Sequence, residues 1–291
     1  MDTDVDVNDD VDSLFGSDSD QDVVNADEVQ LLDGGPVASR TAPNIFGMFF
    51  FPNLISRELH DRVLHQVSAC GYFALQDGSD IASSEDAAYR RSPRNQAMMF
   101  ARSLASPAST IASGSAEQVS NPSSEESPSG CSGLPSWAID LIQHLRELLT
   151  SQPDHHFPLR VKQQLFPQDQ LLSRQLILNL YNGAEGLAPH VDFVNRFADG
   201  IVLCSFGPYG TGTVMDFTHA VHPAQHLFLP SGSVLVLSGE ARYDWKHGIS
   251  ARDVDHVQAE DGSDRVDALK RSIRLSVTIR SMLPGADVVG E

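Results

Sequence analysis

Two residues with metal-binding side chains stand two positions apart, in the run Pro189-His190-Val191-Asp192. In an extended segment, side chains two positions apart point to the same side, so His190 and Asp192 can direct an imidazole and a carboxylate at one point. A second imidazole from a distant strand would complete a facial triad, the arrangement that leaves positions open on a non-haem iron(II) ion. The His-x-Asp pair alone is a weak signal, because it arises by chance in many proteins.

A second candidate imidazole lies far along the chain. The run Arg242-Tyr-Asp-Trp-Lys-His-Gly falls in a segment, 242–249, whose composition predicts a strand. A period of two would place Tyr243, Trp245 and His247 on one face of that strand. His247 is therefore available to join the pair formed by His190 and Asp192.

Two other predicted strands carry unusual polar side chains. In 174–181, Asn179 and Tyr181 occupy the face opposite three alternating leucines. In 272–281, apolar residues alternate with Arg274, Ser276, Thr278 and Arg280. A purely structural strand would seldom carry two arginines on its inner polar face. A dicarboxylate ligand would explain them, since a guanidinium group matches a carboxylate through two parallel hydrogen bonds.

Taken together, these motifs resemble the AlkB family of dioxygenases. The resemblance covers roughly residues 43–102 and 133–282. Four motifs carry most of it: the Asn179-Leu-Tyr181 strand, the His-x-Asp pair eleven residues later, His247-Gly248, and the strand from Arg274 to Arg280. Two softer motifs are Phe206-Gly-Pro with Thr213-Val-Met-Asp-Phe217, and Ser238-Gly-Glu-Ala-Arg-Tyr243. It implies a mainly β fold with some α structure, a double-stranded β-helix or jelly roll with an N-terminal helical extension that faces the substrate.

The resemblance also implies a role for each site residue. His190, Asp192 and His247 would coordinate Fe(II). The cosubstrates would be 2-oxoglutarate and O2. Arg274 and Tyr181 would bind the distal carboxylate of 2-oxoglutarate, and Arg280 and Asn179 would bind the carboxylate beside the keto group. Ser276, where some family members carry Asn, would also belong to the 2-oxoglutarate site. Six strand residues span about 20 Å, so the side chains of the two arginines must converge to reach one small acid.

The resemblance leaves the substrate open among alkylated DNA or RNA bases, tRNA wobble uridines and proteins. The run from Arg242 to Ile249 and the segment Val214-Met-Asp-Phe217 resemble the tRNA-modifying branch. Repair enzymes often carry an acidic base-reading residue two positions after the metal aspartate, where this chain has Val194. The resemblance also leaves the reaction open between hydroxylation and oxidative demethylation, which releases formaldehyde from an N-methyl group. The alternatives to a nucleic-acid enzyme are a protein oxygenase or demethylase and a catalytically weak scaffold.

The elements that must hold these residues follow from periodicity. Residues 45–51 predict a buried strand, and apolar side chains at helical spacing predict a helix from Leu59 to Cys70, capped by Ser56. A second helix is expected at 138–149. Short strands separated by Gly and Pro are expected at 174–181, 201–206, 213–218, 226–229, 233–238, 242–249 and 272–281, a pattern typical of a sandwich or jelly roll.

Composition divides the chain of 291 residues into one domain, two segments that we expect to be disordered and a tail at the C-terminus. Residues 1–42 form an acidic tail, and residues 1–40 alone carry twelve acids and one base, Arg40. A serine-rich insertion, 103–132, interrupts the dioxygenase domain at 43–285, and 286–291 form a short C-terminal tail. The net charge is −19, of which −8 lies outside residues 1–40, so an RNA or DNA substrate would have to be gripped by a local basic patch.

The partners and compartment follow from the remaining features. Arg90, Arg91, Arg94 and Arg102 could form the basic patch, and a protein partner could bind the acidic N-terminal tail.

Three widely spaced cysteines without a Cys-x-x-Cys pair, together with the lack of a signal sequence, favour a reducing compartment, the cytoplasm, the nucleus or both. No apolar run is long enough to cross a membrane, and we expect a monomer.

Overall fold

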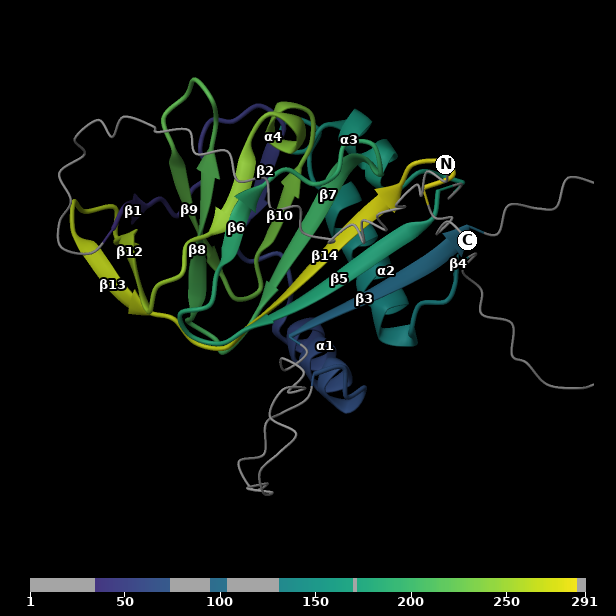
Figure 1. Cartoon of the computed structure of the whole chain (residues 1–291), viewed down its shortest axis with the longest axis horizontal. Helices are drawn as coiled ribbons and strands as arrows, with labels where there is room; N and C mark the ends of the chain where they lie inside the picture. Colours follow the sequence, from purple (N-terminus) through teal and green to yellow (C-terminus); the bar gives the residue numbers. More distant parts are fainter. Residues whose placement is uncertain (1–34, 74–94, 104–130, 170–171, 287–291) are drawn as a thin grey trace, which may run out of the picture. The chain divides into compact units, whose positions relative to one another are not determined.

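The computed structural model describes residues 35–73, 95–103, 131–169 and 172–286 (Figure 1). Most of the expected acidic tail, the interior of the serine-rich insertion, and residues 287–291 lie outside these ranges. In the described part of the chain, no helix is both long and apolar enough to cross a membrane.

Two sheets packed face to face form the body of the fold. The major sheet has seven strands in the order β2 (Met48–Phe51), β10 (Val234–Leu237), β7 (Phe197–Phe206), β14 (Arg274–Met282), β5 (Arg174–Tyr181), β3 (Gln96–Ser103) and β4 (Cys131–Ser132). The minor sheet has four strands in the order β6 (Leu187–His190), β11 (Lys246–Ile249), β8 (Gly212–Thr218) and β9 (Gln225–Pro230). Neighbouring strands within both sheets run antiparallel. This is the predicted jelly roll, or double-stranded β-helix.

Alternation along the strands divides the apolar residues between two cores. On β7, Val202 and Cys204 face a core shared with the helices, whereas Ile201 and Leu203 face the minor sheet. The inner face of the major sheet is apolar at β10 and β7 but polar at β14 and β5. On β14, Leu275, Val277 and Ile279 all join the core on the helical side, so the arginines between them must face the minor sheet.

The helices cover the outer face of the major sheet. They are α1 (Arg57–Ala69), α2 (Ser136–Thr150) and α3 (Leu159–Leu165), and Figure 1 shows α2 behind β14, β5 and β3. The Ser56 hydroxyl accepts a hydrogen bond from Leu59 N at 3.3 Å, which confirms the predicted cap. Because α1 packs through Leu59 and Val63 against this outer face, it does not lie over the inner polar face. The predicted N-terminal helical extension thus packs on the outer face of the major sheet.

Several predicted boundaries also change. The segment 242–249 is not one strand, because α4 (Glu240–Tyr243) occupies its start and β11 begins only at Lys246. Strand β3 was not predicted, and Ser103 pairs with Cys131 across the base of the serine-rich insertion, so the ends of the predicted disordered insertion, 103–132, belong to the sheet. The predicted strand 45–51 shortens to β2.

A third, smaller sheet lies against the outer face of the minor sheet. It consists of β1 (Val37–Ala38), β12 (Val254–Gln258) and β13 (Val266–Lys270), with β1 parallel to β12. Ala38 and Val257 pack with Val214 and Phe228 of the minor sheet in a separate apolar cluster. The ordered domain therefore begins before Pro43, which corrects the predicted end of the acidic tail at residue 42.

Buried charges connect the third sheet to the minor sheet. The Asp255 carboxylate, 1% exposed, accepts hydrogen bonds from Arg252, Arg271 and the backbone N–H of Val214. The neighbouring Asp216 on β8 accepts from His226 Nδ1 at 2.6 Å and from Ser250 Oγ at 2.6 Å. Burial alone would raise the pKa of Asp216, but these hydrogen bonds and the Arg252 charge bring its pKa below the usual value.

We expect Asp216→Asn to lower the free energy of unfolding by about 1–3 kcal/mol near neutral pH, because it removes a charged acceptor from buried donors. A carboxylate whose pKa is lowered by folding stabilises the protein above its unfolded pKa, and this stability is lost as the pH falls through the folded pKa. The difference between parent and variant should therefore shrink below about pH 4. Urea unfolding at several pH values measures this difference in the free energy of unfolding. A difference that stayed constant down to acid pH would contradict the lowered pKa of Asp216.

Candidate metal centre

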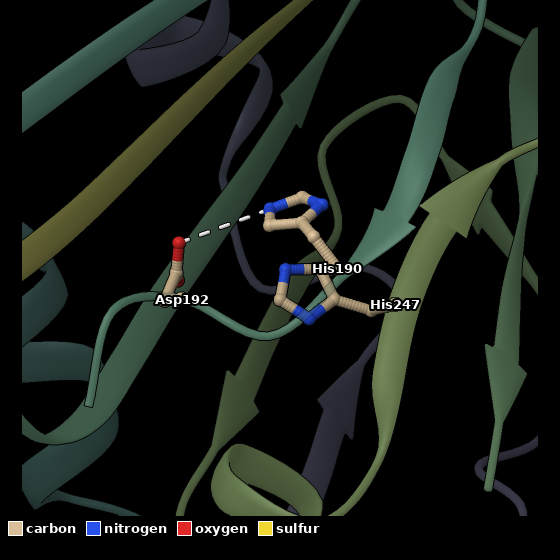
Figure 2. A group of neighbouring side chains, drawn as sticks. All are labelled: His190, Asp192 and His247. Atoms are coloured by element: carbon tan, nitrogen blue, oxygen red, sulfur yellow. Dashed lines mark ion pairs between the residues drawn. The ribbon is translucent and has the colours of Figure 1, made fainter. Parts of the chain in front are cut away.

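Two of the candidate ligands face each other across neighbouring strands. His190 ends β6 and lies directly opposite His247 on β11 in the strand register. Their ring centroids are 4.6 Å apart. Figure 2 shows both imidazoles and the Asp192 carboxylate turned toward one another. The ligand atoms of His190, Asp192 and His247 all lie within 4.8 Å of one another, so the structure brings together the three residues that the sequence predicted.

Asp192 occupies the loop beyond β6. Its side chain is buried, its Oδ1 lies 3.8 Å from His190 Nε2, and the same oxygen forms an ion pair with Arg280 of β14. Its other oxygen, Oδ2, is buried without a hydrogen-bond partner among the described residues. A buried carboxylate oxygen is costly to leave unpaired, so this atom is available to a ligand that the protein itself does not supply.

The protonation of the histidines suits metal binding. His190 Nδ1 lies 2.9 Å from Ala188 O, and because a carbonyl oxygen only accepts, Nδ1 must carry the proton and leave the Nε2 lone pair free. Burial lowers the pKa of His247 to about 4. His247 is therefore neutral near neutral pH, the form in which an imidazole binds a metal.

The glycine after His247 has a steric reason. A side chain on Gly248 would bring its Cβ within 2.8 Å of Leu187 O and of the Pro189 backbone, both on β6. Only glycine lets β11 approach β6 this closely. The close approach holds His190 and His247 in register, which explains in physical terms why the predicted motif is His-Gly.

The donor set fits iron(II). Two imidazoles and one carboxylate form a facial triad with open positions, the ligand set of non-haem iron(II) oxygenases, whereas structural zinc sites are closed by four protein ligands. His190 is 38% exposed on its side chain while Asp192 and His247 are buried, so the triad is open toward solvent from one side.

Arg274 is placed beside Tyr181 and Ser205 on the polar inner face. It lies opposite Tyr181 in the register of β14 and β5, and its guanidinium lies 5.5 Å from the Tyr181 ring centroid. Arg274 Nε donates to Ser205 Oγ at 2.8 Å, while Nη1 is buried without a partner among the described residues. Burial lowers the pKa of Arg274 to about 10, so it stays a cation near neutral pH. A buried cation with a free donor suits an anionic ligand.

The other predicted anchors lie on the same face but make different contacts. Ser276 is opposite Asn179 in the register, and Asn179 Oδ1 accepts a hydrogen bond from Gln96 Nε2 at 2.7 Å. Arg280 forms an ion pair with Asp192, whereas Arg274 contacts Ser205 and Tyr181. The structure therefore divides the two arginines, with Arg280 at the metal-binding carboxylate and Arg274 six residues away along β14.

Sequence reasoning missed the contacts made by Arg242, Ser205 and Gln96. Arg242 belongs to the quoted motif, but the period-two pattern assigned it to a strand, and its partners lie 50 residues away in the chain. Ser205 and Gln96 lie on strands distant in sequence from the residues that they contact. No local signal marks such pairs. Of the predicted basic patch, Arg90, Arg91 and Arg94 lie outside the described residues, as does the side chain of Arg102.

The jelly roll and its His-Asp-His triad define an iron-dependent oxygenase. A family model described as the 2OG-Fe(II) oxygenase superfamily matches residues 47–280, and the chain belongs to this superfamily. It is a 2-oxoglutarate-dependent dioxygenase, whose family uses Fe(II), 2-oxoglutarate and O2, as predicted.

Two sequence relatives bear out the AlkB-like resemblance. The chain is 38% identical over 117 residues to "tRNA (carboxymethyluridine(34)-5-O)-methyltransferase alkbh8" of Xenopus tropicalis, a match covering 37% of this chain and 18% of that protein. It is 30% identical over 164 residues to "Alkylated DNA repair protein ALKBH8 homolog" of Arabidopsis thaliana, covering 50% of this chain and 44% of the relative. The solved structure of OsALKBH1 superimposes with a TM-score of 0.40 at 17% identity, covering 80% of this chain and 97% of that one. The matched part is thus about a fifth of the first relative and under half of the second.

Proposed function

We propose that this dioxygenase oxidises a base of a nucleic acid, by hydroxylation or by oxidative demethylation. The observation that carries the proposal is the similarity to two relatives whose names refer to tRNA and to alkylated DNA. Because the chain spans only part of each relative, we carry over the class of substrate and not the methyl transfer named for the first. When bound, iron and 2-oxoglutarate with O2 supply oxidation of a substrate C–H bond, with release of succinate and CO2.

In this proposal the protein holds the cosubstrate by its charged groups and orients it against the triad. Arg274, with Tyr181 beside it, would bind the distal carboxylate through the free donor on Nη1. Arg280, Asn179 and Ser276 would serve the end nearer the metal, because Arg280 already contacts Asp192. His190, Asp192 and His247 would hold the iron.

Exposed aromatic rings around α4 support a base as substrate. We call Phe46, Phe193 and Tyr243 the α4 aromatic cluster; their exposures are 73%, 47% and 38%. Phe193 follows Asp192 in the chain, Arg242 of α4 contacts both Phe193 O and the Tyr243 ring, and Phe46 O accepts from Ala241 N. Exposed aromatic rings beside a reactive centre can stack on an unpaired base.

Charge should make nucleic-acid binding weak and sensitive to salt. The charge of −8 outside residues 1–40 opposes a polyanion, so Arg90, Arg91, Arg94 and Arg102 are proposed to supply the phosphate contacts. A base must also leave its stack to reach the triad, which favours single-stranded or loop substrates over duplex.

We expect succinate formation by the full chain with Fe(II) and 2-oxoglutarate to be stimulated by unpaired tRNA loops or single-stranded alkylated oligonucleotides. Phe193→Ala should raise the KM for the nucleic acid about tenfold, because a base–aromatic stack contributes about 1–3 kcal/mol. Decarboxylation without a substrate should be unchanged in this variant. Succinate and the modified base, measured by mass spectrometry, report the two effects separately.

Tyr209→Ala is the matched control, since Tyr209 is 45% exposed but packs against Arg57 and Asp61 of α1. It should leave the KM for nucleic acid unchanged. Turnover of peptides but of no RNA or DNA would overturn the proposed substrate and favour a protein oxygenase. The absence of any succinate would favour the scaffold alternative.

A further inference from the structure

Asp192 needs support that its strand does not provide. Strand β6 ends at His190, and the backbone from Val191 to Phe193 belongs to no strand. No ladder of hydrogen bonds therefore fixes the loop that carries the metal-binding carboxylate. Its backbone carbonyls, like all buried backbone groups, need donors from elsewhere.

Arg242 supplies those donors. Its Nη1 donates to Asp192 O at 2.9 Å, and its Nη2 lies 3.4 Å from Phe193 O. The longer contact is secondary, because Phe193 O also accepts from the backbone N–H groups of Arg196 and Phe197. The bond to Asp192 O is thus the specific one, and it spans 50 residues of sequence.

The burial of Arg242 is unusual for the contacts that it makes. The side chain is 1% exposed, and the described residues give it no carboxylate partner within ion-pair distance. Burying a guanidinium costs free energy that a backbone carbonyl offsets only in part. Asp192 and Asp199 are the acidic groups whose charges favour it there. Two arginines therefore act on one residue, since Arg280 contacts the side chain of Asp192 and Arg242 its backbone.

Arg242 also lies in the segment that connects β10 to β11, the strand that carries His247. Helix α4 follows β10 and leads into β11, so Arg242 precedes His247 by five residues. The connection is held in shape by Trp245, whose Nε1 donates to Glu240 Oε1 at 3.0 Å and whose ring is buried. A bond from Arg242 to Asp192 thereby ties the segment before one ligand to the loop that carries another.

We propose that Arg242 is a positioning residue of the metal centre, which holds the Asp192 loop so that the carboxylate and His247 address the same point. This inference rests on the proposed metal site but not on the proposed nucleic-acid substrate. Residues that hydrogen-bond to metal ligands typically change metal affinity about 10- to 100-fold when they are replaced. The same range is expected here.

The test is calorimetric titration of the full chain with Mn²⁺, which reports binding without turnover. We expect Arg242→Met to weaken Mn²⁺ binding about 10- to 100-fold. Arg242→Lys, which keeps a cation and one donor, should recover part of the loss. Arg271→Lys is the matched control, because Arg271 is buried to a similar degree but binds Asp255 and Ser250. It should lower the Tm without changing Mn²⁺ affinity.

The outcomes separate the possibilities. If Arg242→Met is folded by circular dichroism and binds Mn²⁺ as tightly as the parent, the positioning role is wrong. An equal loss of affinity in Arg271→Lys would also overturn it, since the effect would then be general destabilisation. A parent protein that binds no Mn²⁺ would overturn the metal centre together with this inference. Graded loss from Lys to Met, with the control unchanged, supports it.

Discussion

His247→Ala is expected to abolish succinate formation from 2-oxoglutarate and to remove measurable Mn²⁺ binding. The reason is that one of only three protein ligands is lost, so the effect should exceed the about 10- to 100-fold that follows when a hydrogen-bonding partner of a ligand is lost. His247 is buried and neutral, and the substitution removes no buried charge. The fold should therefore survive, with a cavity in place of the imidazole. Calorimetry and a succinate assay on the same preparation measure both effects.

His256→Ala is a suitable control, because His256 lies on β12 of the third sheet and takes no part in the triad. His190→Ala should behave like His247→Ala, since the two histidines are paired in register. Full succinate formation in a folded His190→Ala or His247→Ala variant would show that the metal is held elsewhere.

Arg274→Ala is expected to raise the KM for 2-oxoglutarate by about 30- to 4000-fold while leaving Mn²⁺ affinity near that of the parent. Removing one partner of a buried hydrogen-bonded charge pair costs about 2–5 kcal/mol, and each 1.4 kcal/mol corresponds to about tenfold in affinity. The metal should be little affected, because Arg274 contacts Ser205 and Tyr181, and among the described residues it makes no contact with the triad. Steady-state kinetics and Mn²⁺ calorimetry give the two values.

Lysine at position 274 should restore only part of the affinity, because an ammonium group cannot match a carboxylate with the planar fork of arginine. Arg252→Ala, which removes an arginine from the charge network behind the minor sheet, serves as the control and should leave the KM unchanged. Equal KM values in parent and Arg274→Ala would mean that another residue binds the far carboxylate.

The sequence predicted best where a short pattern carries the information. The alternation from Arg274 to Arg280 placed both arginines on the inner face, and the structure shows the intervening apolar residues in the core on the helical side. The helical spacing after Ser56 predicted α1 and its cap. The spacing of His190 and Asp192 directs both side chains to one side, and the surrounding motifs identify the pair as metal ligands. In each case neighbours in the sequence are neighbours in the structure.

Prediction failed where contacts between distant segments decide the structure. The alternation of aromatic residues from Tyr243 to His247 suggested one strand, but Gly239, with a φ of 53°, starts a helical turn, and the Glu240–Trp245 hydrogen bond closes it. His247 reached the predicted site because the register of β11 with β6 places it opposite His190. The role of Arg242 and the position of β3 depend on partners far away in sequence, which periodicity cannot reveal.

The split of the site between two sheets has a thermodynamic consequence. Two of the candidate metal ligands, His190 and His247, belong to the minor sheet, and the proposed 2-oxoglutarate anchors belong to the major sheet. A dianion bound at Arg274 and at the metal would bridge the two layers, so the layers could not separate without releasing it. Ligand binding would then be linked to unfolding. It would raise the free energy of unfolding by about 2.7 kcal/mol at a free ligand concentration one hundred times the Kd. The cosubstrate would act as a removable cross-link of the sandwich, and its concentration would set how readily the two layers part.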